Sequence, residues 1–238
     1  QCIGSDLWSD EPGFTEAMSG TGVTGICGSG IIEVIAEMYL AGIISTDGVI
    51  DGALAGQTQR IVADGRTFSY VLHSADDPEA SDVLVTQNDV RQIQLAKAAL
   101  YAGIKLLMDE MCVTTVDRIR LAGAFGSHIS VSHAMVLGLI PDCDLEQVTS
   151  AGNAAGAGAR MALLDRNARL EIAATIAKAE RIETAVADDF QAHFVGAMGL
   201  PHQSDPFPNL FSVVAPPEAK VVESAGTPKR RRRRAARA

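Results

Sequence analysis

Three glycine-rich junctions are the parts of this chain best suited to chemistry. They lie at residues 25–30 (Gly-Ile-Cys-Gly-Ser-Gly), 121–126 (Leu-Ala-Gly-Ala-Phe-Gly) and 151–158 (Ala-Gly-Asn-Ala-Ala-Gly-Ala-Gly). Each follows a short apolar run, and the first and third open a helix-like pattern. A strand, a glycine turn and a helix start form a common phosphate cradle, because backbone N–H groups and the positive helix end face the anion. The junctions therefore predict a nucleotide cleft or part of one.

Each junction also has a purely structural interpretation. The first suits phosphate at a helix start or a tight turn, and it lacks the Lys-Ser/Thr of a P-loop. It is also an incomplete dinucleotide fingerprint, because Glu33 stands where a third small residue is needed. The second suits a flat ring or a plain turn, and the third suits ligand contact or close helix packing. The candidate binding residues are Gly28, Ser29, Gly30, Gly123, Ala124, Phe125, Gly126, Gly152, Asn153, Ala154 and Gly156.

Reactive side chains give weaker signals. Lys97 interrupts an apolar stripe, so its amine either reaches water along the protein surface or points into a cleft as a further cofactor-binding group. His128 and His133 are five residues apart and do not form a helical metal pair, so no metal site is predicted. No Ser/His/Asp set or pair of acids can be assigned a catalytic role. The four cysteines form no CxxC pair and are interpreted as scattered core thiols of a reduced cytoplasm.

Strands and helices alternate around these junctions, with one hairpin at Asp64-Gly65. Thr86 and Asp89 form the pattern of a capping box. The helix that follows should bury a stripe formed by Val90, Ile93, Leu100, Ile104, Leu107 and Met111. Strands are predicted at 23–26, 60–63, 66–72, 83–85, 118–121, 148–150 and 182–186, and helices at 29–42, 132–138, 154–164, 167–181 and 189–198. This order predicts an α/β layer fold.

Composition sets limits on the class of protein. No stretch of about 18 apolar residues occurs, so no membrane span is expected. Residue 1 is Gln, and the chain is expected to be a piece of a longer protein.

Residues 203–238 lose periodicity and are predicted to be a disordered tail, rich in proline and then in arginine. Residues 229–238 hold seven of the 20 basic residues, and the remaining 228 residues hold 13 bases against 29 acids. Nucleic acid is therefore expected only through the tail.

Five stretches together resemble a known family. They are residues 25–44 (GICGSGIIEVIAEMYLAGII), 86–107 (TQNDVRQIQLAKAALYAGIKLL), 117–130 (DRIRLAGAFGSHIS), 138–141 (GLIP) and 151–164 (AGNAAGAGARMALL). Over about residues 20–202 the chain is similar to the C-terminal domain of the reductive activators of corrinoid proteins. Residues 1–202 would then be the C-terminal part of an actin-like ATPase domain.

The resemblance implies a lobe of the acetate and sugar kinase, heat-shock chaperone and actin superfamily, with a mixed sheet flanked by helices. ATP with Mg²⁺ would bind between two lobes. It implies that a two-iron, two-sulfur domain, absent here, passes an electron to a Co(II) corrinoid protein or corrinoid-dependent methyltransferase in the cytoplasm. The product is Co(I), and ATP drives the transfer. Gly28–Gly30, Gly123–Gly126 and Gly152–Gly156 match turns of the family.

Departures from the family leave alternatives open. The aspartate-containing phosphate loops and the cysteine-rich domain are absent, so the ATPase-coupled reductase activity is expected of the intact protein and not of this fragment alone. The arginine-rich tail is not explained by the resemblance. A non-catalytic module that docks a corrinoid protein and a dinucleotide-binding enzyme domain remain alternatives, although the Asp64-Gly65 hairpin disfavours the second. Among partners, a second copy of the chain in a homodimer is also left open.

Overall fold

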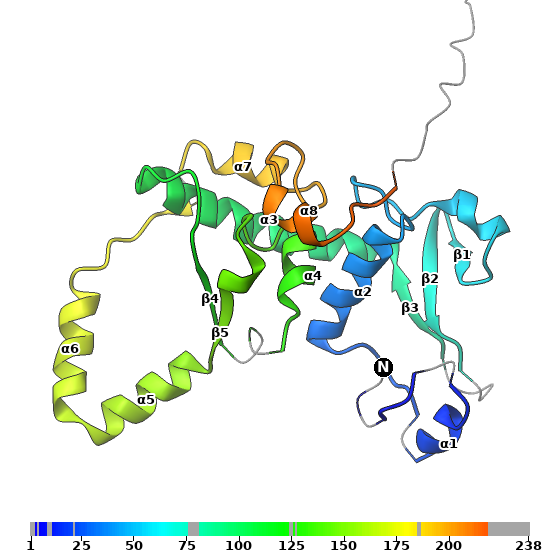
Figure 1. The fold of residues 1–238 in the computed structure, drawn as a ribbon, viewed down its shortest axis with the longest axis horizontal. Helices are drawn as coiled ribbons and strands as arrows, with labels where there is room; N and C mark the ends of the chain where they lie inside the picture. The colour runs from blue at the N-terminus through cyan, green and yellow to red at the C-terminus, as the bar shows by residue number, and fades with distance from the viewer. Residues whose placement is uncertain are drawn as a thin grey trace, which may run out of the picture.

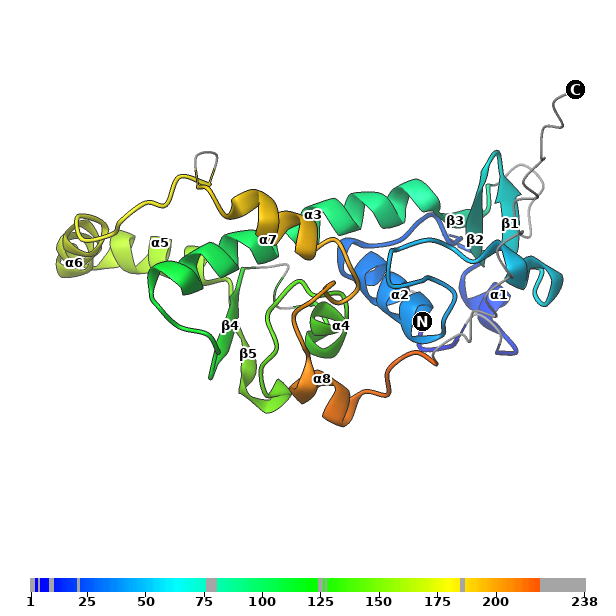
Figure 2. The ribbon, with the colours of Figure 1, turned by 90° about the horizontal axis from the view of Figure 1, so that it is seen from above.

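The structure is a computed structural model that describes residues 3, 5–8, 11–20, 22–75, 81–123, 126, 128–184 and 187–218. Helices and two small sheets are arranged along helix α3, which runs with the long axis of the molecule (Figures 1 and 2). The helices are α1 (Phe14–Ala17), α2 (Gly28–Leu40), α3 (Gln87–Glu110), α4 (Val131–Val136), α5 (Ala154–Leu164), α6 (Arg166–Ile176), α7 (Phe190–Gly196) and α8 (Pro208–Val213), with 3-10 turns η1 (Gly52–Gly56) and η3 (Leu145–Gln147).

The first sheet is antiparallel and has the order β1-β2-β3. Its strands are β1 (Ile61–Asp64), β2 (Thr67–His73) and β3 (Val83–Thr86). Asp64 pairs with Thr67 across the turn, and Gly65 there has a φ of +60°. The predicted hairpin at Asp64-Gly65 is thus confirmed, because glycine adopts this left-handed conformation without steric penalty.

The second sheet is a parallel pair formed by β4 (Ile119–Ala122) and β5 (Val148–Gly152). Helix α4 lies between these strands in sequence and packs against α2, while α7 packs against α3. The α/β prediction is confirmed. Across the described residues, the sheets are one antiparallel group and one parallel pair, and neither is the doubly wound parallel sheet that a dinucleotide-binding domain requires.

Helix α3 begins at the predicted capping box. The Thr86 hydroxyl accepts from the N–H of Asp89, and the Asp89 carboxylate accepts from the N–H of Thr86. The predicted buried stripe is confirmed only in part: Val90 is buried and Ile93 packs against the core, but Leu100, Leu107 and Met111 are exposed. The buried face instead carries Gln94, Lys97, Ala98, Tyr101 and Ala102. Polar residues can occupy this face because Gln94, Lys97 and Tyr101 find hydrogen-bond partners inside the body.

Several predicted boundaries differ from the structure. Residues 23–26 are not a strand, since they pair with no other strand among the described residues. Helix α6 ends at Ile176, earlier than the predicted 181. Residues 182–184 are not in a strand, and residues 185 and 186 lie outside the described part. The helices predicted at 29–42, 132–138, 154–164 and 189–198 are confirmed as α2, α4, α5 and α7 with small shifts at their ends.

The expected disorder from residue 203 is wrong for the part that the structure describes. Helix α8 packs into the core through Leu210, and Phe207 just before it is also buried. Asp142 holds the start of this helix, accepting hydrogen bonds from the N–H groups of Asn209 and Leu210 at 3.0 Å each. Pro208 is compatible with a first helical turn, which explains why recurring prolines misled the prediction. Residues 219–238, including the arginine-rich segment, lie outside the described part.

None of the described helices combines the length and the apolar character needed to cross a bilayer.

Candidate functional site

The second and third glycine junctions meet at the carboxyl ends of β4 and β5. Leu121 pairs with Ser150 near these ends, and the N–H of Gly123 donates to the carbonyl of Gly152 at 2.8 Å. The N-terminal end of α2, which carries the first junction, faces the same lower side of the molecule in Figure 1. Ligands of α/β proteins commonly bind outside the carboxyl ends of parallel strands. All three glycine junctions therefore lie on the same side of the molecule.

The first junction caps helix α2 with a thiol. Cys27 Sγ accepts from the N–H of Gly30 at 3.3 Å and lies 3.6 Å from the hydroxyl of Ser29. The hydrogen bond with Ser29, followed by the one from Gly30, lowers the pKa of the exposed Cys27 thiol. The N–H groups of Gly28 and Ser29 precede the first intrahelical hydrogen bond, and the Ser29 N–H also helps to lower the pKa of the Cys27 thiol.

The third junction uses a side-chain cap of the same kind. Asn153 Oδ1 accepts from the N–H of Gly156 at 2.9 Å and so starts α5, immediately before Ala154. A Cβ on Gly156 would come within 3.1 Å of the Asn153 side chain, so close packing accounts for this glycine. Gly152 differs, because its φ is +62° and a Cβ built on it meets no atom within 4 Å. Open space therefore lies beside Gly152.

The second junction is only partly described. Gly123 has a φ of +119°, and a Cβ on it would also enter open space. A Cβ on Gly126 would lie 3.1 Å from the Cβ of Leu121, so this glycine allows the chain to turn back over its strand. Ala124 and Phe125, both predicted to contact a ligand, lie outside the described residues.

Lys97 is not directed into an open cleft. Its side chain is 0% exposed, and its amine donates to the carbonyl of Pro201 at 2.7 Å and to the carbonyl of Gly199. Burial lowers the pKa of Lys97 to about 7. Neither the predicted surface position nor the predicted cofactor contact is correct, because both contacts are to the protein's own backbone. Through these two hydrogen bonds, Lys97 holds the 199–201 segment against α3.

The cysteine prediction also needs correction. Cys143 is buried, but Cys27 and Cys112 are exposed, so these two are not core thiols. Among the described residues, no group of three or more His, Cys, Asp or Glu side chains could hold a metal ion.

The sequence did not reveal a polar chain that joins α4 to α2. His133 Nδ1 lies 2.7 Å from the hydroxyl of Ser130, and its Nε2 lies 2.7 Å from a carboxylate oxygen of Glu37. Ser130 is the N-cap residue of α4, and Glu37 is well exposed. We interpret this set of contacts as a tie between α4 and α2.

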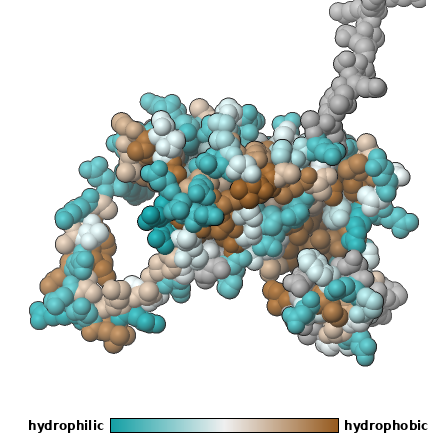
Figure 3. Space-filling view, viewed as in Figure 1, coloured by the Kyte–Doolittle hydropathy of each residue, from teal (hydrophilic) through white to brown (hydrophobic). Residues whose placement is uncertain are grey.

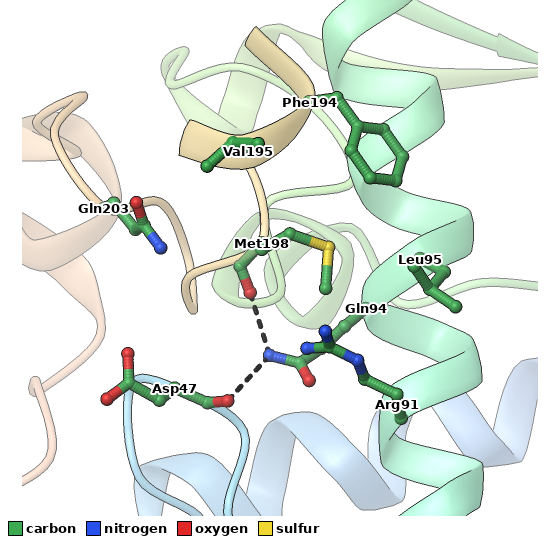
Figure 4. A pocket seen from close by; sticks show the side chains of 8 residues that line it. All are labelled: Asp47, Arg91, Gln94, Leu95, Phe194, Val195, Met198 and Gln203. Atoms are coloured by element: carbon green, nitrogen blue, oxygen red, sulfur yellow. Dashed lines mark hydrogen bonds between the residues drawn. The ribbon is translucent and has the colours of Figure 1, made fainter. Parts of the chain in front are cut away.

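A second feature missed by the sequence is a hollow of about 360 Å³ between α3 and α7 (Figure 4). Gln94 lines the hollow and donates to the carbonyls of Asp47 and Met198 at 3.1 and 2.8 Å. None of the predicted binding residues lines it. The lining consists of Asp47, Arg91, Gln94, Leu95, Phe194, Val195, Met198 and Gln203.

Residues 5–211 match the sequence family described as "C-terminal domain of RACo the ASKHA domain". Since this match spans most of the chain, the protein belongs to that family. The predicted resemblance and the superfamily of the fold are thereby confirmed. Membership of this superfamily supports nucleotide binding in general.

Two relatives add detail. The chain is 35% identical over 154 residues to "Corrinoid activation enzyme RamQ" from Eubacterium limosum, a match covering 61% of this chain and 26% of RamQ. A solved structure, "Reductive activator for corrinoid,iron-sulfur protein", is similar with a TM-score of 0.67 and 33% identity, covering 74% of this chain and 28% of that chain. The present sequence thus spans about a quarter of the length of these relatives.

Proposed function

We propose that this chain is one wall of the nucleotide site in an ATP-dependent reductive activator of corrinoid proteins. In the proposed reaction, one electron reduces a Co(II) corrinoid to Co(I), while ATP and water become ADP and phosphate. The family match and the names of both relatives support this class of activity. The observation that carries the proposal is the common side of the three glycine junctions, where the carboxyl ends of β4 and β5 and the N-terminal end of α2 lie.

The residues present fit an anionic nucleotide. Space is open beside Gly152, and the helix ends at Gly28 and Ala154 each carry backbone donors and a positive dipole end. When bound, ATP with Mg²⁺ would supply the free energy that favours one lobe arrangement over another. The junctions would hold the nucleotide by shape and main-chain contacts. Main-chain contacts suit this chain because residues 1–228 hold only 13 basic side chains against 29 acidic ones, so few positive side chains are present to bind phosphate.

The described residues do not fit an iron–sulfur cluster. Cys27, Cys112 and Cys143 belong to no cluster of metal ligands. We therefore place the electron donor, a two-iron, two-sulfur domain in the family resemblance, outside this chain. The proposed partner is a corrinoid protein or a corrinoid-dependent methyltransferase of the cytoplasm, where free thiols such as these three persist.

Substitution of Gly152 tests the nucleotide wall. Asparagine tolerates the left-handed conformation at φ +62°, so Gly152→Asn should fold while its side chain fills the open space. We expect ATP to bind about tenfold more weakly to the complete polypeptide carrying this change, a loss of about 1.4 kcal/mol. Isothermal titration calorimetry with Mg²⁺ and ATP measures it.

The matched control is Gly65→Asn, at φ +60° in the β1–β2 turn and also beside open space. It should leave the affinity for ATP unchanged. Equal affinities in a folded Gly152→Asn variant and in the control would remove the third junction from the site. Retained binding of a corrinoid protein with no ATP turnover in the unaltered polypeptide would instead favour the docking module.

A further inference from the structure

The segment that joins α7 to α8, residues 199–207, contains a buried histidine, and we call this segment the α7–α8 corner. The His202 side chain is only 6% exposed. Its ring lies against the ring of Tyr101 on α3, with the two centroids 4.9 Å apart. On the other helix, a Cβ built on Gly196 of α7 would lie 3.0 Å from the Cε1 atom of His202. The ring is therefore enclosed between α3 and α7.

The hydrogen bonds of this ring require its neutral form. Among the described residues, its donors are the N–H groups of Ser204 and Asp205, which both donate to His202 Nδ1, at 3.1 and 2.8 Å. A ring nitrogen accepts only when it carries no proton, so the neutral ring with its proton on Nε2 fits the corner. A second proton would turn Nδ1 into a donor that faces two backbone donors. The Asp205 carboxylate does not solve this conflict, because its Oδ1 lies 3.7 Å from Nδ1.

The residues beside His202 attach the corner to α3. Lys97 donates to the carbonyl of Pro201, the residue just before the histidine, at 2.7 Å. The hydroxyl of Tyr101 donates to the carboxylate of Asp205 at 2.8 Å. The backbone positions of Pro201 and Asp205 are linked through the ring, because its Nδ1 atom holds the turn between them. Loss of these two hydrogen bonds would therefore weaken both attachments to α3.

The charged groups around the ring oppose a second proton on it. Burial has the largest effect on the pKa of His202 and lowers it. Asp205 acts in the opposite direction and raises the pKa. Lys97 and Lys105 on α3 and His193 on α7 lower it further. Three basic groups on the two enclosing helices thus face a single carboxylate.

The other neighbouring elements supply no further negative charge to the ring. Tyr101 stays neutral, because burial raises the pKa of its hydroxyl. On the α8 side, Asp142 already accepts from the N–H groups of Asn209 and Leu210. Helices α5 and α6 stand apart from the body that holds the corner (Figure 3). A protonated ring would therefore be poorly compensated in the closed corner.

We propose that His202 is an acid-sensitive switch: when its ring gains a second proton, the α7–α8 corner detaches from α3 while the rest of the domain stays folded. Opening lets the charged ring reach water, which removes the conflict at Nδ1. An open ring takes up its proton with the ordinary pKa of 6.5, whereas the closed ring has a lowered pKa. The closed corner is therefore most stable above pH 6.5 and loses stability as the pH falls below it. This inference concerns the conformation of the domain and goes beyond the proposed function.

Hydrogen exchange of backbone amides tests the switch in the complete polypeptide that carries this sequence. Protection factors at pH 7.5 and pH 5.5 are compared, since they correct for the effect of pH on the chemical exchange rate. The protection of residues 203–205 should fall about tenfold, because pH 5.5 lies about one unit below the ordinary pKa of the ring. The β1–β2 hairpin is the internal reference and should keep its protection. Unchanged protection of the corner, or an equal loss in the hairpin, would overturn the proposal.

The variant His202→Asn separates the proton from the hydrogen bonds. Asparagine Oδ1 can accept from N–H groups two and three residues later, but it takes up no proton in this pH range. The corner should remain protected at pH 7.5, and its protection should no longer fall at pH 5.5. The matched control is His193→Gln on α7, whose amide can replace the contact of His193 Nε2 with Asp109. This control should keep the tenfold fall, whereas an equal fall in His202→Asn would assign the acid sensitivity to another group.

Exchange of the imidazole C2 hydrogen provides a measurement that needs no substitution. Its pH dependence, followed by mass spectrometry, gives the pKa of the His202 ring in the unaltered polypeptide. That pKa should lie below 6.5. A pKa at or above this value would overturn the proposal, even if His202→Asn failed to fold. None of these readouts involves ATP or cobalt, so the outcome is independent of the proposed activity.

Discussion

Replacing Gly138 by alanine should destabilise the domain by about 3 kcal/mol or more. Gly138 follows α4 with a φ of +70°, and a Cβ there would overlap the carbonyl oxygen of Pro201. The left-handed conformation alone costs an L-residue about 1–2 kcal/mol, and overpacking a filled site adds about 1–3 kcal/mol. The clash is with backbone, and Lys97 holds that same carbonyl, so the segment has little freedom to move away. Urea unfolding followed by circular dichroism measures the loss.

The Gly65→Ala variant separates the conformational penalty from the cost of overpacking. Gly65 has a similar φ of +60°, but a Cβ on it meets no atom within 4 Å. Only the conformational penalty applies, so we expect a loss of about 1–2 kcal/mol. If the two variants lost equal stability, the close contact between Gly138 and Pro201 would be contradicted.

Replacing Lys97 by methionine should lower the free energy of unfolding by about 2 kcal/mol or more at pH 9. Methionine keeps the length and apolar character of the stem, but it leaves the carbonyls of Gly199 and Pro201 without the donor that Lys97 supplies. A buried polar group without a partner costs about 1–3 kcal/mol. Lys105→Met is the control on the same helix. Its amine, partly exposed, pairs with Asp205 at 3.5 Å, so a loss below about 1 kcal/mol is expected.

The loss at Lys97 should depend on pH. Its pKa falls to about 7 in the folded protein from an ordinary value of 10.5. Between these values the unfolded chain holds a proton that the folded chain lacks, so wild-type stability rises with pH from about 7 to 9. Below pH 7 the penalty for the buried charge is fully present. Burial lowers the pKa of neighbouring His202 from 6.5, so that ring titrates below this window.

Unfolding curves at pH 6, 7, 8 and 9 check this dependence. The gap between wild type and Lys97→Met should widen from pH 7 to 9, whereas Lys105→Met should follow the wild-type slope. A constant gap would mean that the amine keeps its proton throughout, and the lowered pKa would be wrong.

Sequence patterns predicted those parts of the fold that depend on the conformations of neighbouring residues. The Asp64-Gly65 turn and the Thr86 cap act through the conformations of neighbouring residues, and both occur as expected. The face of α3 depends instead on distant partners. Leu107 was expected inside and Lys97 at the edge or in a cleft, but Lys97 is buried because carbonyls about 100 residues later receive its amine. Residue type alone carries no information about such partners.

The candidate site, too, was predictable only where residues close together in the sequence form it. Glycine spacing located the three junctions, and the parallel pairing of β4 and β5 brings Gly123 to Gly152. The hollow between α3 and α7 could not be predicted, because it is formed by residues such as Asp47 and Met198 that only the tertiary fold brings together. The His133–Glu37 tie joins residues 96 positions apart and has no sequence signature.

A crystal structure of the complete polypeptide with a non-hydrolysable ATP analogue and Mg²⁺ is the decisive test of the proposed nucleotide wall. We expect the nucleotide at the carboxyl ends of β4 and β5, with backbone N–H groups of residues 25–30 or 151–158 about 2.7–3.2 Å from its oxygens. A nucleotide seated in the hollow beside Arg91 and Gln94, or anywhere else remote from the glycine junctions, would contradict it.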